Sequence, residues 1–104
     1  MKAGTKVKIT KVGVVAGSKY RTASKEEYDP GMDNGLVSPP VDYEVRGTLA
    51  GDVVLGRPIL VERTHRNGLP VRGGMVTSRV TCVSFKDNGV VVTTGNSQYL
   101  LVEE

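Results

Sequence analysis

The sequence contains few of the residues that form disulfide bonds or supply reactive side chains. Its 104 residues include one cysteine, one histidine and no tryptophan. A single cysteine, Cys82, excludes an intrachain disulfide and a zinc site built from cysteines. Because Cys82 lies in the alternating stretch Val80-Thr81-Cys82-Val83, we expect a buried and unreactive thiol there.

Large apolar side chains and long apolar runs are also scarce. There are five aromatic residues, so valines have to fill much of the core of the single domain expected over residues 1–104. A core of this kind favours a homo-oligomer, in which a partner covers part of the apolar surface. No segment approaches the roughly 20 apolar residues of a membrane span, and the basic N-terminus lacks a signal-type apolar stretch. We therefore expect no membrane association and a cytoplasmic location, the host cytoplasm if the protein is phage-encoded.

No set of residues with catalytic spacing stands out. A nucleophile needs a base within hydrogen-bond reach and a third group that orients the base. The only histidine, His65, and the only cysteine lie on separate predicted elements, and the carboxylates show neither paired nor metal-ligand spacing. His65 is expected to be a solvated residue beside a hairpin tip. The sequence predicts a protein that is not an enzyme and needs no cofactor or metal.

The second half of the chain has the clearest structural pattern. Between residues 58 and 102, short β-branched runs alternate with turn dipeptides. This pattern predicts an antiparallel meander of four strands, at 59–64, 75–85, 90–94 and 98–102. Asn-Gly pairs at 67–68 and 88–89 favour hairpins with type I′ turns, in which both central residues have positive φ.

The first half adds two strands and an irregular segment. Alternation over 5–15 predicts an edge strand with Val7 and Ile9 inward, and alternation over 41–49 predicts a strand with Val41, Tyr43 and Val45 inward. A single helical turn is expected at 24–28, and the proline-rich segment 29–40 is expected to be a loop that contacts a partner subunit. The predicted fold is mainly β: a small antiparallel sheet or barrel-like domain with a C-terminal meander and at most one or two short helices.

Lysine and arginine are distributed unevenly along this chain of net charge +3. Six of the seven lysines lie in the first 25 residues, where they form either a nucleic-acid-binding arm or a solvated strand face. Arginine predominates in the second half, and its planar guanidinium binds phosphate oxygens bidentately. Two interpretations stay open for these arginines: they bind an anion, or they pair with Glu62 and Asp87 and keep the sheet soluble. The arginines are Arg57, Arg63, Arg66, Arg72 and Arg79.

Two short motifs in the second half resemble a known pattern. They are Thr-Ser-Arg-Val at 77–80 and Thr-Gly-Asn-Ser-Gln-Tyr at 94–99. Over residues 60–101 the chain resembles small phage and prophage proteins that include the anti-Thoeris sponge family. Those sponges sequester signalling nucleotides of the cyclic ADP-ribose type without turning them over. The resemblance implies a phage-encoded anti-defence protein that sequesters such a molecule, or a cyclic dinucleotide, without catalysis.

The anion-binding interpretation of the arginines and the resemblance to the sponge family together suggest a set of ligand-binding residues. In this hypothesis Asn96 bonds a base edge, serines bond ribose or phosphate, arginines neutralise phosphate, and Tyr99 stacks on the base. Several alternatives remain open. Ser78 is also suited to an ordinary strand and Asn96 to a turn with positive φ, and the protein could instead bind nucleic acid or protein through its basic N-terminal strand, or be a structural phage protein. The predicted site residues are Arg57, Arg63, Arg66, Ser78, Arg79, Asn96, Ser97 and Tyr99.

Overall fold

The computed structural model describes residues 1–17, 21–22 and 37–104, and all the regular elements in these ranges are β-strands. The predicted mainly β fold is therefore confirmed. The expected helical turn at 24–28 and residues 29–36 of the expected loop lie outside the described residues. The strands are β1 (Lys6–Val14), β2 (Arg21–Thr22), β3 (Val37–Ser38), β4 (Glu44–Leu49), β5 (Pro58–Arg66), β6 (Gly73–Lys86), β7 (Gly89–Thr94) and β8 (Ser97–Glu103).

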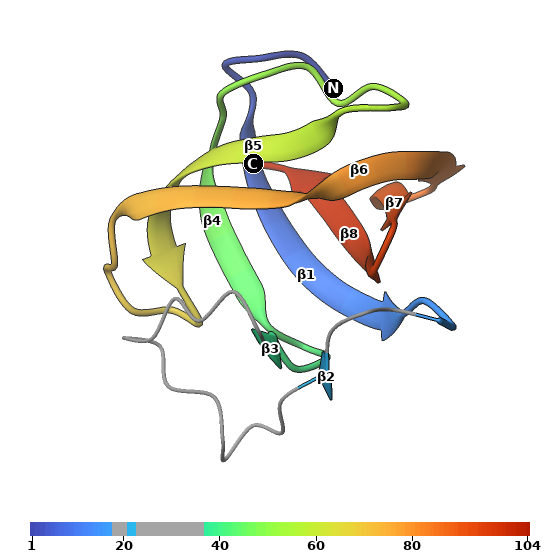
Figure 1. Cartoon of the computed structure of the whole chain (residues 1–104). Coiled ribbons are helices and arrows are strands. Elements are labelled where there is room, and N and C mark those ends of the chain that lie inside the picture. The colour runs from blue at the N-terminus through green and yellow to red at the C-terminus, as the bar shows by residue number, and fades with distance from the viewer. Residues whose placement is uncertain (18–20, 23–36) are drawn as a thin grey trace.

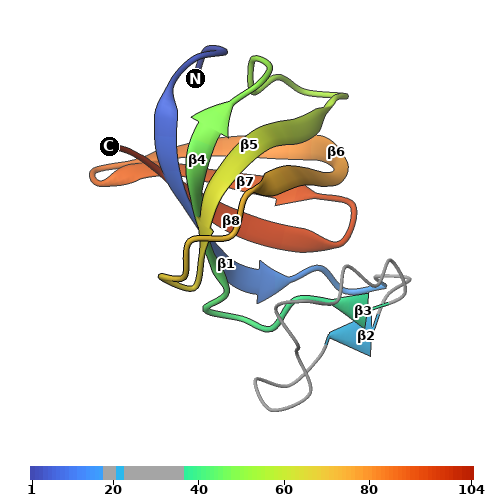
Figure 2. The same cartoon turned by 90° about the vertical axis from the view of Figure 1, so that its left-hand side faces the viewer.

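Six of the strands close into an antiparallel barrel in the order β1-β4-β5-β6-β7-β8, while β2 and β3 form a small parallel pair beside it (Figure 1). The predicted four-strand meander corresponds to β5 to β8. The barrel closes because β1 pairs on one side with β4 and on the other with β8, so that Val7 lies between Gly47 and Glu103. The expectation that β1 is an edge strand is thus wrong. Figure 2 shows the wall of the barrel from the side, with β4 and β5 in front.

Alternating side chains fill the barrel interior. Val7 and Ile9 of β1 are buried, as are Val45 of β4 and Tyr43 just before it, which confirms the predicted inward positions. Val41 was also expected inward, but its side chain is exposed. The reason is a turn at Asp42, which has φ +74°, so the chain becomes regular only at Glu44.

The two Asn-Gly pairs have different roles. Asn67 and Gly68 have φ of +49° and +79°, which confirms the predicted type I′ turn after β5. At the β6–β7 hairpin the paired residues are Lys86 and Gly89, and Asn88 does not have positive φ. A Cβ atom on Gly89 would overlap the backbone oxygen of Leu101 on β8, so close packing explains this glycine.

Register shifts between neighbouring strands change which side chains point into the barrel, and two of them affect predicted site arginines and the single cysteine. Opposite β4, Arg63 pairs with Gly47 and Arg66 pairs with Val45, with a register shift between them. Both arginines therefore share the inward face of Val45, and His65 is exposed. On β6 a second shift between Val80 and Cys82 leaves the Cys82 thiol exposed, which corrects the expectation of a buried cysteine.

Candidate functional site

The polar residues of the barrel interior gather at one end, which we call the cationic end. This end is formed by the last residues of β1, β5 and β7 and the first residues of β4, β6 and β8, and it lies at the bottom of Figure 1. Antiparallel neighbours necessarily bring strand ends and strand starts together in this way. The inward side chains at this end are those of Lys11, Tyr43, Arg63, Arg66 and Tyr99.

Arg63 is one of the buried cations of the cationic end. Its side chain is buried, with 7% of the residue surface exposed, and its Nε atom donates a hydrogen bond of 3.1 Å to the carbonyl oxygen of Val71. Gly73 leaves space for the guanidinium, because a Cβ atom there would lie 2.7 Å from Nη2. Among the described residues no carboxylate forms an ion pair with Arg63. A buried cation without an opposite charge carries a desolvation cost of several kcal/mol.

Arg66 follows Arg63 by three residues along β5, and 2% of its residue surface is exposed. Its carbonyl oxygen accepts a hydrogen bond of 2.9 Å from the backbone N–H of Leu69, which closes the type I′ turn. The bulge in β5 is the reason that this arginine points inward: simple alternation after Arg63 would have placed His65 there.

Lys11 adds a third buried cation and is fully buried. Its Nζ atom donates a hydrogen bond of 2.6 Å to the carbonyl oxygen of Pro39. Burial of the ammonium group lowers the pKa of Lys11 from 10.5 to about 8, because desolvation disfavours the charged form. At neutral pH the lysine is therefore still charged, but it holds its proton less firmly than an exposed lysine does.

Two tyrosines flank Lys11. The backbone N–H of Lys11 donates to the carbonyl oxygen of Tyr43 at 2.9 Å, and Tyr99 is its register partner on β8. Both tyrosines are buried and belong to the core of the barrel. Tyr99 is thus placed beside the buried cations, in the interior of the protein.

The hydroxyl-rich motifs form a hydrogen-bonded cluster, which we call the hydroxyl network. Ser78 Oγ donates to Thr94 Oγ1 at 3.0 Å, and Asn96 Nδ2 donates to Ser78 Oγ at 3.2 Å. The backbone N–H of Ser97 also donates to Thr94 Oγ1, at 3.2 Å. The network ties the β7–β8 turn to β6. Asn96 does not have positive φ, so its side chain, and not its backbone conformation, gives this residue its place in the turn.

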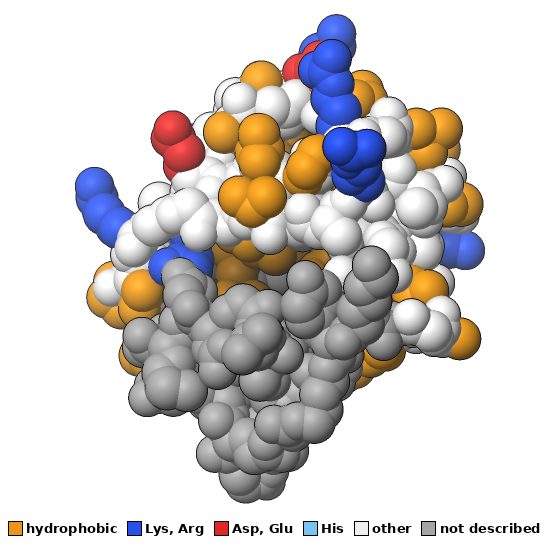
Figure 3. Space-filling model, viewed as in Figure 1, with side chains coloured by type: hydrophobic (Ala, Val, Ile, Leu, Met, Phe, Trp, Pro, Cys, Tyr) orange, Lys and Arg blue, Asp and Glu red, His pale blue; other side chains and the backbone are white. Residues whose placement is uncertain are grey.

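Two of the predicted site arginines lie on the outside of the barrel. Arg57 and Arg79 are exposed, and Arg79 lies opposite Pro58 at the start of β5. Basic side chains stand out from the surface in this region (Figure 3). The structure therefore brings Arg63, Arg66 and Tyr99 together at the cationic end. It places Ser78, Asn96 and Ser97 in the hydroxyl network and separates the two outer arginines from both groups.

Sequence reasoning missed two residues of the cationic end, Lys11 and Tyr43, as members of a site. A signal for Lys11 was present, because the alternation that points Val7 and Ile9 inward continues to position 11. A lysine at an inward position of a strand is unusual, since lysine is seldom fully buried.

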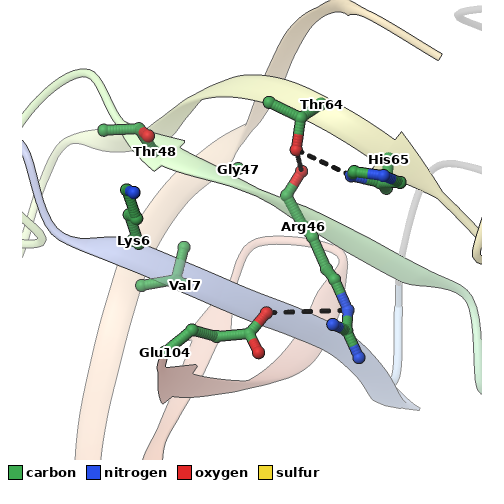
Figure 4. A pocket seen from close by; sticks show the side chains of 8 residues that line it. All are labelled: Lys6, Val7, Arg46, Gly47, Thr48, Thr64, His65 and Glu104. Carbon is green, nitrogen blue, oxygen red and sulfur yellow. Dashed lines mark hydrogen bonds and ion pairs between the residues drawn. The ribbon is translucent and has the colours of Figure 1, made fainter. Parts of the chain in front are cut away.

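A hollow of about 270 Å³ lies on the outer surface of β1, β4 and β5 (Figure 4). Opposite charges meet in it, because Arg46 Nε contacts Glu44 Oε1 at 3.2 Å and Glu104 Oε1 at 3.5 Å. His65 contacts the hydroxyl of Thr64 at 2.9 Å and is exposed, as the sequence predicted. Because Arg46 already contacts two carboxylates, this hollow suits an anion less well than the cationic end does. Its lining residues are Lys6, Val7, Arg46, Gly47, Thr48, Thr64, His65 and Glu104.

Over the described ranges, the side chains of His, Cys, Asp and Glu form no group of three that could hold a metal ion. The same part of the chain contains no helix with the length and apolar character needed to cross a membrane. Comparison with protein-family models, curated proteins and solved structures finds no match for this chain.

Proposed function

We propose that this protein binds an anionic, nucleotide-like small molecule at the cationic end of the barrel and sequesters it without chemical change. The observation that carries the proposal is the burial of Arg63 without a carboxylate partner among the described residues. Because the C-terminal half resembles phage sponge proteins, we further propose that the protein has an anti-defence role. The ligand is then a cyclic nucleotide of the cyclic ADP-ribose type or a cyclic dinucleotide.

The energetics of Arg63 favour an anionic ligand. A buried guanidinium that lacks an opposite charge destabilises the folded protein, and a phosphate group would offset that cost. A hydrogen bond to a charged group contributes about 1.5–3 kcal/mol, and a guanidinium donates two such bonds to one phosphate in the bidentate arrangement. Gly73 supports this role, because it leaves the guanidinium room beside the backbone.

The neighbouring residues suit a nucleotide-like molecule. Lys11 and Arg66 add two further buried cations, and Tyr43 and Tyr99 provide aromatic rings at the same end. Binding without turnover is supported by the placement of the two most reactive side chains. His65 and Cys82 are exposed on the outer surface, whereas the cations point inward.

The test compares an inward arginine with an outward one. Calorimetry against cyclic ADP-ribose isomers and cyclic dinucleotides should show binding by the wild-type protein. Arg63→Gln should lower the affinity by roughly 10- to 150-fold, which corresponds to the loss of about 1.5–3 kcal/mol. Arg79→Gln is the matched control, because Arg79 is exposed on the outer face of the barrel, and it should leave affinity unchanged. If Arg79→Gln weakens binding and Arg63→Gln does not, the site lies on the outer face of the barrel. If the wild-type protein binds none of these nucleotides, the sequestration proposal is refuted.

Nucleic acid is the competing ligand class. Lys6 and Lys8 point outward from β1, and Lys8 lies opposite Arg46 on β4, so the outer wall also carries adjacent basic side chains. Binding of mixed-sequence DNA through this wall would weaken steeply with salt, because each phosphate contact releases counterions. If DNA binds in this way and the double variant Lys6→Gln/Lys8→Gln abolishes binding, the nucleic-acid function replaces sequestration.

The expected homo-oligomer is also part of this proposal. The predicted contact through the 29–40 loop lies largely outside the described residues. Support from the described residues comes from apolar side chains on the barrel wall, among which Leu60 and Val76 are exposed.

A further inference from the structure

We propose that the outer face of β5 and β6 is the interface of a two-fold symmetric homodimer. The occupant of this face is a second copy of the same chain. The inference does not depend on ligand binding, because the surface involved points away from the barrel interior.

The centre of this face is apolar. Leu60 on β5 and Val76 on β6 are directly opposite in register, so their side chains lie next to each other on the same face of the sheet. They are 40% and 69% exposed, respectively. Two adjacent apolar side chains in the middle of a sheet wall form the kind of surface that a partner covers.

Opposite charges lie on either side of this apolar pair. Glu62 follows Leu60 by two residues and points outward, while Arg79 lies at the other side, opposite Pro58. Neither Glu62 nor Arg79 forms an ion pair with any described residue. In Figure 3 hydrophobic atoms lie in the middle of the face over β5 and β6, with an acidic group to their left and basic atoms to their right; further basic atoms lie at the far left, and further acidic atoms lie beside the basic ones at the top.

This order of charges is complementary to itself. In a two-fold dimer the same patch faces its own copy in the reverse direction. With the axis in the plane of the interface, passing across the strands near Leu60 and Val76, Glu62 faces Arg79 of the partner subunit, and the symmetry repeats the pair. The apolar side chains then meet at the centre, where water is excluded. Charged groups at such a rim select the partner and its orientation.

The face is separate from the cationic end. Side chains alternate along β5, so Glu62 points outward and the next residue, Arg63, points into the barrel. Dimerisation through this wall therefore leaves the interior cations where they are. Changes in assembly and changes in ligand affinity should be independent of each other.

A charge-exchange experiment tests the interface. Sedimentation velocity over a concentration range should show a reversible dimer for the wild-type protein. Glu62→Arg and Arg79→Glu should each weaken the dimer by about 10- to 100-fold, because each change places like charges opposite one another twice. The double variant Glu62→Arg/Arg79→Glu restores opposite charges and should recover the dimer. Val76→Asp should weaken the dimer to a similar extent.

Matched controls and a folding check complete the design. Glu103→Arg and Lys86→Glu make the same charge changes at exposed positions away from the patch, and they should leave the dimer intact. Circular dichroism and thermal melting verify that each variant is folded. A wild-type protein that stays monomeric at every concentration would overturn the proposal. So would a dimer that survives both single reversals, or a double variant that fails to recover assembly.

Discussion

Replacement of Lys11 by methionine should stabilise the protein at neutral pH. The fully buried ammonium loses much of its hydration on folding, and its pKa falls from 10.5 to about 8. A difference between two pKa values is worth about 1.4 kcal/mol for each pH unit, so carrying this charge costs about 3 kcal/mol at pH 7. Methionine has a similar volume and no charge. Part of the gain is offset because the carbonyl oxygen of Pro39 loses its hydrogen bond, and we expect a net stabilisation of about 1–2 kcal/mol.

The stabilisation by Lys11→Met depends on pH. Below pH 8 the lysine is charged in both the folded and the unfolded chain, so its cost is fully present. Between pH 8 and 10.5 the unfolded chain keeps a proton that the folded protein has released, so the wild-type protein gains stability as pH rises through this range. The advantage of Lys11→Met should therefore shrink by about 2–3 kcal/mol between pH 7 and pH 10.5.

Urea unfolding of the two proteins at several pH values measures this difference directly. Titration of all other groups is common to both proteins and cancels. Lys8→Met is the control, because it makes the same substitution at an outward position of the same strand. A constant difference between Lys11→Met and wild type across the range would refute the argument. A strong destabilisation by Lys11→Met at pH 7 would also refute it, since the ammonium would then be stabilising the fold.

Three further predictions concern individual residues. Gly47→Ala should destabilise the protein by about 1–3 kcal/mol in chemical denaturation, because the added Cβ would overlap the backbone oxygen of Glu62, whereas Gly74→Ala has open space and should be neutral. Ser78→Ala should cost about 1 kcal/mol by removing two hydrogen bonds of the hydroxyl network; a cost equal to that of Ser84→Ala would contradict this role. The thiol of Cys82 should react with a disulfide reagent in the folded protein nearly as fast as in urea, and strong protection would show that it is buried.

Local patterns were sufficient to predict most of the strands. Alternation between apolar and polar residues located β5 to β8 within a few residues and put Val7, Ile9 and Val45 on the correct face. The Asn67-Gly68 turn was also predictable, because positive φ at two successive residues has a strong local signature. These features depend only on residues that are close in sequence.

The closure of the barrel and the composition of the candidate site depend on more distant relations. Pairing of β1 with β8 joins the two ends of the chain, and nothing in either strand alone specifies it. The bulges in β5 and β6 shift the alternation by one residue, which turns Arg66 inward and Cys82 outward. For this reason the eight predicted site residues are divided among the cationic end, the hydroxyl network and the outer face of the barrel. No property of the individual residue types predicts that division.

The position of β8 between β7 and β1 has a consequence for biosynthesis. The ribosome makes β8 after β1 to β7. A nascent chain that holds only these seven strands therefore lacks the strand that pairs with both β7 and β1. During this interval β1 and β7 each present an unpaired edge, which is the feature that leads sheets to associate with other chains. The finished barrel has no such edge. A chain that lacks β8 is therefore more exposed to edge-to-edge association than the closed barrel, and the pairing of β8 removes both free edges.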